Sequence, residues 1–232
     1  MKKLINLSFL AVMAISMAFV ACKKDPKDDP NDGPGYVVEA KNVDESVSSI
    51  ANAAAIKESD VFETNPDCIV KGKYKNAGFK LTLPNVLADK YLSNSYPDSP
   101  DTKFESIEII ALDAKNKNIG QFSYGSEVVN GVAVVISYVY HNADYHCQES
   151  YSWEYNGDTW QSEINCNFKK GWNKGYTTID YNTNETKTTL QEPAGFTYSW
   201  MFLTTSLKAP ATMQTPQDIY AREVMMRKEM VQ

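Results

Sequence analysis

The sequence contains few of the residues from which nucleophilic or metal-dependent active sites are built. Its 232 residues include two histidines and four cysteines. It has no nucleophile elbow, no HExxH or CxxC motif and no glycine-rich phosphate loop. These absences lower the expectation of an enzyme without removing it, because the residues of an active site need not be close in sequence. No catalytic residue is assigned from the sequence.

Basic residues are also in the minority. The chain has 23 Lys and Arg against 29 Asp and Glu, which gives a formal net charge of −6. A protein that neutralises phosphate groups usually carries a basic excess. Nucleic acid is therefore not expected as a partner.

The chain has one long apolar run, which lies at its amino end. Lys2 and Lys3 precede a mostly apolar stretch, residues 4–20, and charged residues follow from Lys23 onward. This layout is typical of a secretory signal, and the charges end the run before it reaches a stable membrane span of about 20 residues. We expect residues 1–21 to be removed as a signal peptide, which would change the formal net charge from −6 to −8.

Four residues at the end of this run, Phe19, Val20, Ala21 and Cys22, resemble the lipobox of bacterial lipoproteins. Phe19 stands where the motif usually has Leu and keeps its apolar character. The resemblance implies that Cys22 carries a lipid anchor, so that the membrane is a partner. Each buried CH₂ of such an anchor adds about 0.8 kcal/mol of membrane affinity. The alternative is ordinary secretory cleavage, which leaves Cys22 as a simple thiol.

Residues 22–35 are rich in charge and proline and are expected to form a flexible tether. The Lys-Lys-Asp and Lys-Asp-Asp runs that begin at Lys23 and Lys27 resemble the acidic export signals of Bacteroidetes surface lipoproteins. This resemblance implies lipid anchoring to the outer membrane, on the cell surface or the periplasmic face. A solvated spacer explains the same residues equally well.

After the tether, short runs rich in Tyr, Val, Thr, Ile and Trp alternate with Asn, Gly, Asp and Pro. This pattern is typical of antiparallel strands, so residues 36–205 are expected to form one all-β domain, an antiparallel β-sandwich. The expected strands are 36–43, 69–83, 106–111, 119–124, 131–140, 145–155, 158–168, 176–181, 186–191 and 196–203.

The Asn156-Gly157 dipeptide predicts a two-residue turn, because both positions accept positive φ. A turn at this point fixes the register of the two flanking strands. Residues with odd numbers in 145–155 then share a face with those of even number in 158–168. One face is aromatic and apolar, whereas the opposite face is almost entirely polar. We therefore expect one buried face and one solvent-exposed face.

The same register places Cys147 directly opposite Cys166, within the Cα separation that a disulfide needs. An exported chain meets an oxidising compartment, so a Cys147–Cys166 disulfide is predicted. Two free buried thiols are the alternative. Cys68 is then left over, and burial beside Ile69 and Val70 is expected for it.

His141, Asp144 and His146 lie near a predicted turn and are the best candidates for a zinc or copper site. Oxidation of Cys147 would leave too few ligands. No metal and no cofactor are therefore expected.

Two further sets of acidic and amide residues are candidates for sites. Asp180, Asn182 and Asn184 alternate like the oxygen ligands of a calcium loop, but the glycine and the final bidentate acid of such loops are missing, so a polar hairpin turn is expected. Paired carboxylates can cleave glycosidic bonds. The predicted register brings together no two of the acids on the long hairpin, which are Glu149, Glu154, Asp158 and Glu163.

The carboxyl end differs from the rest of the chain. Thr215-Pro216-Gln217-Asp218 supplies an N-cap, a proline in the first turn and an early acid. Apolar residues then recur at helical spacing. Residues 206–232 are therefore expected to form a linker and a short helix that packs on the domain.

Three segments resemble small Bacteroidetes lipoproteins with β-sandwich domains: residues 74–84, Lys169–Asn173 and Gly195–Trp200. The resemblance implies an envelope location and a β-sandwich, and it carries no established activity. Aromatic residues make up 12% of the chain. Exposed rings could stack on glycans or peptides, although rings such as Trp153, Trp160, Trp172 and Trp200 more often fill a core.

Three functional hypotheses follow. The first is a surface module for binding or adhesion, with a glycan or a protein as its ligand. The second is a structural or assembly component of the envelope or of a surface fibre. The third is an envelope hydrolase, which a pocket with carboxylates converging from separate strands would favour.

Overall fold

The chain is built from β-strands throughout the part that the computed structural model describes, residues 35–43, 49–155 and 157–203. Within these ranges there are two short 3-10 turns, η2 (Glu58–Asp60) and η3 (Asp89–Tyr91), and no α-helix. The predicted all-β class is confirmed. The strands are β1 (Tyr36–Ala40), β2 (Asn52–Lys57), β3 (Val70–Lys73), β4 (Phe79–Leu83), β5 (Asn94–Tyr96), β6 (Ser99–Leu112), β7 (Asn118–Ser126), β8 (Val132–His141), β9 (Tyr145–Tyr155), β10 (Asp158–Phe168), β11 (Gly171–Asp180), β12 (Glu185–Thr189) and β13 (Tyr198–Leu203).

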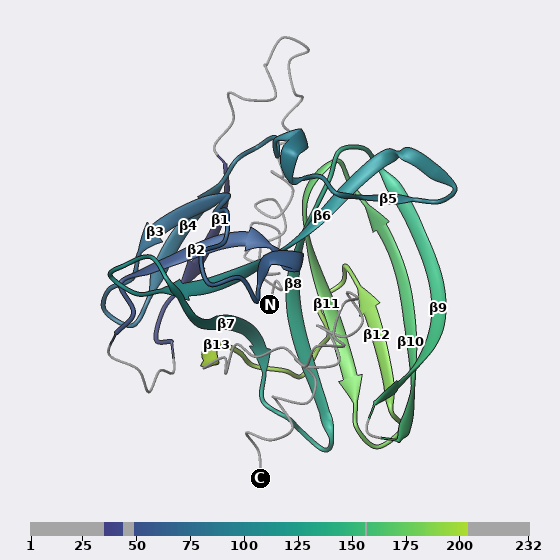
Figure 1. Ribbon diagram of the computed structural model, residues 1–232. Helices are drawn as coiled ribbons and strands as arrows, with labels where there is room; N and C mark the ends of the chain where they lie inside the picture. The colour runs from purple at the N-terminus through teal and green to yellow at the C-terminus, as the bar shows by residue number, and fades with distance from the viewer. Residues whose placement is uncertain (1–34, 44–48, 156, 204–232) are drawn as a thin grey trace, which may run out of the picture. The chain divides into compact units, whose positions relative to one another are not determined.

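The described strands form two sheets (Figure 1). One is the antiparallel pair β1–β4, and the other has eleven strands along the path β3-β2-β6-β7-β8-β11-β12-β10-β9, with β5 paired to β6 and β13 to β7. The expectation of antiparallel pairing is wrong at one place, because β10 and β12 are parallel. The strand β12 runs antiparallel to β11, as hairpin partners do, but lies between β11 and β10.

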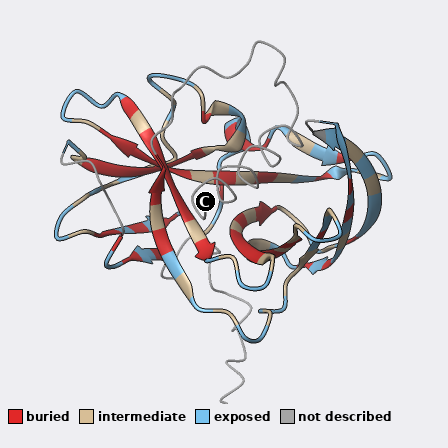
Figure 2. Ribbon diagram, turned by 90° about the horizontal axis from the view of Figure 1, so that it is seen from below, coloured by how far each residue is buried: buried red, intermediate tan, exposed pale blue. Residues whose placement is uncertain are grey.

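The main hydrophobic core lies between the β1–β4 pair and one face of the large sheet. Leu81 and Val38 from the pair are each 1% exposed, and they share this core with Ile109, Val134 and other residues of the large sheet. Figure 2 shows buried positions concentrated in these strands, whereas β9 and β10 are mostly half-buried or exposed. The arrangement is sandwich-like, with two sheets packed face to face over apolar side chains.

Strand β2 was not expected from the sequence, because its residues Asn-Ala-Ala-Ala-Ile-Lys include three alanines, which have low β-propensity. Its first five residues are buried. Ala53 and Ala55 face the main core, whereas Ala54 and Ile56 pack in a second cluster on the opposite face of the sheet. The strand is thus covered on both faces, so its small side chains reflect close packing and not a lack of strand structure.

A single strand was expected over residues 69–83, which is wrong. The structure has two strands there, β3 and β4, and they belong to different sheets. The chain turns at Asn76 and Ala77, whose φ angles are 53° and 50°. Reciprocal hydrogen bonds between the backbones of Lys75 and Gly78 close this turn. Because Ala rarely adopts positive φ, the dipeptide gives little signal of a turn in the sequence.

The register of the β9–β10 hairpin is the one predicted. Tyr155 is opposite Asp158, Trp153 opposite Trp160, and Cys147 opposite Cys166. The rings of Trp153 and Trp160 stack with centroids 5.4 Å apart. The sorting of the faces is also confirmed, since Trp160, Ser162, Cys166 and Phe168 on β10 are buried and their neighbours in between are mostly exposed.

Several predictions concern residues outside the described ranges. The signal peptide (1–21), Cys22 and nearly all of the tether precede residue 35, and the C-terminal helix follows residue 203. These stay predictions. Within the described ranges, no helix has both the length and the apolar character needed to span a membrane.

Candidate functional site: a cavity in the curled sheet

The part of the large sheet that lies beyond the sandwich core curls around a cavity. Strand β6 pairs with β8 through Phe104 and His141, and the sheet then continues through β11, β12 and β10 to β9 (Figure 1). At the far end of this path Tyr145 of β9 reaches back to the β5–β6 hairpin, where its hydroxyl donates to Asp98 at 2.8 Å. Its ring also stacks on Tyr96 at 3.6 Å between centroids.

The cavity enclosed in this way has a volume of about 410 Å³. This lies in the range of roughly 300–1,000 Å³ that is typical of small-molecule sites. Glu149 of β9 lines the cavity and is also exposed, so the cavity opens to solvent along β9. The described residues that line it come from β5, β6, β8, β9, β10, β11, β12 and the segments beside them.

Aromatic rings close one end of the cavity. Tyr96 stacks on Phe104 with centroids 4.6 Å apart, and His141 stacks on Phe168 at 4.1 Å. The Tyr96 hydroxyl is 2.9 Å from Nε2 of His141. Tyr96, Phe104 and Phe168 all line the cavity, which therefore has an apolar wall at this end.

Hydroxyl groups line the middle of the curled sheet. Ser162 of β10 is 2.8 Å from Thr186 of β12, and Thr177 of β11 is 2.9 Å from Thr188 of β12. The indole Nε1 of Trp153 donates to Ser162 at 2.8 Å. These cross-strand bonds satisfy polar groups in a half-buried surface and hold its hydroxyls in fixed positions.

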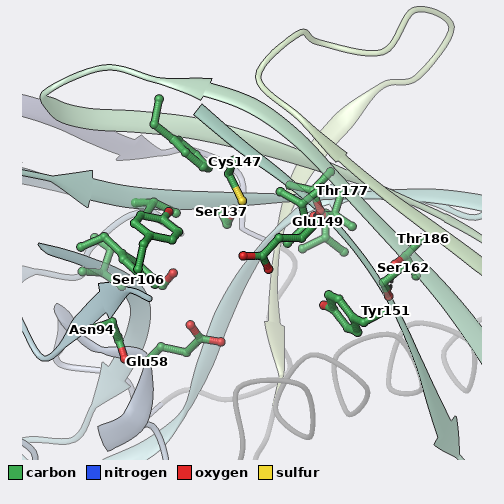
Figure 3. Close-up of a pocket in the computed structure, with 18 of the residues that line it drawn as sticks. Glu58, Asn94, Ser106, Ser137, Cys147, Glu149, Tyr151, Ser162, Thr177 and Thr186 are labelled. Carbon is green, nitrogen blue, oxygen red and sulfur yellow. Dashed lines mark hydrogen bonds between the residues drawn. The ribbon is translucent and has the colours of Figure 1, made fainter. Parts of the chain in front are cut away.

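Three carboxylates line the same cavity from separate elements. Glu58 lies in η2, Glu108 on β6 and Glu149 on β9. Figure 3 shows the carboxylates of Glu58 and Glu149 pointing into a common space, with the hydroxyl of Tyr151 turned toward it. Glu108 accepts a hydrogen bond from Nε2 of Gln121 at 2.6 Å. None of the described lining residues is Lys, Arg or His.

The candidate metal ligands do not come together. His141 is fully buried in the aromatic wall, whereas His146 is exposed and its Nδ1 is 2.9 Å from Oδ1 of Asn167. Asp144 accepts hydrogen bonds from Nζ of Lys169 at 2.9 Å and from the backbone N–H of Lys170 at 2.8 Å. Alternation along the strands explains the separation, because residues 141 and 146 lie on opposite faces of the sheet.

The calcium-like residues form a polar hairpin turn, as expected. Asp180 accepts hydrogen bonds from the backbone N–H and the side chain of Asn182, at 2.9 and 3.1 Å. The Asn182 amide also donates to the carbonyl of Asn130 at 3.0 Å. Among all the described residues, no group of three or more His, Cys, Asp or Glu is placed to hold a metal ion.

The predicted disulfide is absent from this structure. Cys147 and Cys166 lie directly opposite each other, but both thiols are free. The sulfur of Cys166 instead donates toward the carbonyl of Thr188 on β12, at 3.6 Å. Register brings two Cβ atoms close together, but a disulfide also needs both sulfurs to turn toward each other. The correct register was therefore not sufficient for the pairing.

The leftover cysteine, Cys68, is half-buried and packs against the cluster that contains Ile56 and Val61. Its thiol donates toward the carbonyl of Pro66 at 3.6 Å. Of the four tryptophans, Trp160 and Trp200 are buried, at 1% and 5% exposure, and the other two are half-buried.

Part of this site is predicted by the sequence. The hairpin register placed Cys147, Glu149 and Tyr151 on the inner face of β9. Glu58 was missed because β2, the strand directly before it, was not expected, and Tyr96 was missed because β5 has only three residues. No local pattern marks these positions, which reach the cavity through pairing with distant strands.

Comparison of the chain with known protein families, curated proteins and solved structures gives no significant match.

The buried histidine gives a prediction about acid stability. Burial lowers the pKa of His141 from 6.5 to about 4, so the unfolded chain binds the proton more readily than the folded one. Stability is then lost as the pH falls from 6.5 toward 4. A shift of this size corresponds to roughly 3 kcal/mol. Urea unfolding at several pH values should show this loss in the wild type and a flatter profile in His141→Phe.

The variant keeps a stacked ring at residue 141, and it leaves Glu105 in place, whose pKa burial raises. Protonation of Glu105 changes stability in the opposite direction, so the difference between the two profiles isolates the histidine. Parallel profiles for the two proteins would contradict the assignment.

The free thiols give a second prediction. Burial raises the pKa of Cys147 to about 12 and that of Cys166 to about 11. At pH 8 both are protonated and shielded, so iodoacetamide should modify them slowly in the native protein and rapidly in urea. The prediction would be contradicted if mass spectrometry of unreduced peptides found Cys147 and Cys166 joined by a disulfide.

Proposed function

We propose that this protein is a binding module of the bacterial cell envelope, anchored by lipid on Cys22, which takes a small ligand into the cavity of its curled sheet. The observation that carries the proposal is the 410 Å³ cavity itself, with an apolar aromatic wall, ordered hydroxyls and carboxylates from three separate elements. A concave site with a few convergent polar groups is typical of ligand binding. The sequence supports the envelope location through the lipobox-like residues Phe19–Cys22.

A hydrolase is the second candidate, because Glu58 and Glu149 belong to separate elements and line one cavity. Paired carboxylates of this kind cleave glycosidic bonds in many enzymes. The general acid of such an enzyme is held in water-excluded surroundings. Glu149 is exposed and Glu58 is only half-buried, which favours binding over catalysis.

Filling the cavity should abolish binding. A screen of monosaccharides, short glycans and small peptides by thermal shift is expected to find ligands that stabilise the wild type, since binding to the folded state raises its melting temperature. Ser106→Trp places a large ring in the cavity from β6 and should remove the shift. Ser150→Trp makes the same change at an exposed position of β9 and should keep it.

Circular dichroism of both variants would confirm that the sheet is retained. A ligand shift that survives in folded Ser106→Trp would place binding outside the cavity. The absence of any ligand across the screen would contradict the binding function and favour an assembly role.

The location is tested separately with protease on cells. If the domain is displayed on the surface, proteinase K added to intact cells should digest it, as it does after lysis. A periplasmic marker protein serves as the control and should survive until the cells are lysed. Protection of the domain on intact cells would place it on the periplasmic side of the membrane and remove adhesion from consideration.

A further inference from the structure

Strand β9 forms a long open edge of the large sheet. It is the last strand of the path and, among the described strands, pairs only with β10 (Figure 1). It has 11 residues, whereas the edge strands β3 and β13 have four and six. It contains no Lys or Pro, and its pairing with β10 has no bulge. Proteins commonly use these devices to keep other chains from an edge, so β9 is accessible to a partner strand.

One hydrogen bond shows which backbone groups of β9 face this edge. The backbone N–H of Gln161 on β10 donates to the carbonyl of Asn184, on the side of β12 and away from β9. Gln161 is opposite Ser152, so this pair exchanges no backbone bonds, and the N–H and C=O of Ser152 point away from β10. The two-residue period gives the other even-numbered residues, from His146 to Glu154, the same direction. Each of them is exposed, so this edge is reachable from solvent.

The sequence of β9 is complementary to itself when two copies run antiparallel around Ser150. His146 of one copy then lies opposite Glu154 of the other, on both sides of the two-fold axis. The pairs between them join uncharged amide and hydroxyl side chains. An imidazole N–H donates to a carboxylate, and such cross-strand pairs stabilise a sheet. Nδ1 of His146 is 2.9 Å from Oδ1 of Asn167, so Nε2 is the nitrogen that faces the partner's carboxylate.

The neighbouring registers are less favourable. Pairing centred on Glu149 sets the two Glu149 carboxylates opposite each other, and like charges in this arrangement are destabilising. Pairing centred on Tyr151 places Glu154 opposite Gln148 and moves His146 beyond the end of the partner strand. The register centred on Ser150 keeps the charge pairs and uses the whole length of β9.

We infer that two copies of this chain associate through β9, by antiparallel pairing centred on Ser150. Backbone hydrogen bonds along the edge supply affinity, and the side-chain pairs fix the register. The contact closes on itself, because both copies use the same edge. Glu149, which lines the cavity, then lies opposite the partner's Tyr151, and the cavity faces of the two copies share one side of the joined sheet. This interface goes beyond the proposed function and does not depend on the ligand.

Cysteine crosslinking tests the register. Ser150 meets its own copy at the two-fold axis, where the Cα atoms of a hydrogen-bonded pair are about 5.5 Å apart, within disulfide range. Treated with a mild oxidant, the full-length Ser150→Cys variant should give a disulfide-linked dimer on a non-reducing gel. Ser152→Cys is the matched control, because it is equally exposed on the same face. Its two copies would be about 14 Å apart in this register, so it should stay at the background of the wild type.

A charge exchange tests the pairs across the interface. In sedimentation equilibrium, the full chain should show a monomer–dimer equilibrium. His146→Glu or Glu154→Lys alone should weaken dimerisation about tenfold, because the two-fold axis doubles the loss of each exposed pair. The double variant should recover the affinity, since acid and base exchange places between the copies. Within one strand the two positions are about 27 Å apart, so the recovery cannot arise inside one chain.

Two results would overturn the inference. The first is a chain that stays monomeric at all concentrations, which would leave the edge to a strand of another protein. The second is a dimer that ignores the charge exchange and is linked as readily through Ser152→Cys as through Ser150→Cys, which would place the interface elsewhere. Neither result bears on the binding of a ligand in the cavity.

Discussion

The structure depends on three strands, β6, β8 and β11, whose two faces are both used. On β8, Val134, Ile136 and Tyr138 point into the main core, whereas Val135, Ser137 and Val139 point toward the cavity. This division follows from the two-residue period of a strand, which sends successive side chains to opposite faces. A shift of one residue in the β8–β11 register would place serine in the sandwich core and tyrosine in the cavity. Correct pairing of these strands therefore forms the hydrophobic core and the lining of the cavity together.

The two sides of the sheet are stabilised differently. Apolar contact dominates the core side, where Phe79 packs on Trp200 and Phe122 with ring centroids about 5 Å apart. The cavity side has fewer apolar contacts and relies on cross-strand hydroxyl pairs and on stacked rings at its two ends. Trp153 and Trp160 lie near one end of β9 and β10, and Tyr145 and Phe168 lie at the other. Polar side chains line the space between these two aromatic ends.

The sequence predicts much of this architecture, because most strands alternate clearly and Asn156-Gly157 marks one turn. It could not reveal Asn52–Lys57 as a strand, since burial on both faces selects small residues that resemble a helical run. The insertion of β12 between β10 and β11 was equally hidden, because strand order depends on tertiary packing and leaves no local trace. The cavity is also predicted only in part. The hairpin register predicts which residues of β9 face it, whereas Glu58 and Tyr96 reach it through the pairing of strands that are distant in sequence. The free thiols show that a correct register does not determine side-chain rotamers.

The position of β12 also constrains the order of events during biosynthesis. Strand β10 pairs with β12 through Gln161 and Glu185, which are 24 residues apart in sequence, although β11 is made in between. Until the ribosome has released residues 185–189, β10 and β11 must both present open backbone edges separated by the width of one strand. Open edges invite pairing with other chains. Folding after export, which the proposed envelope location implies, would shorten this interval, because β12 has then already been synthesised.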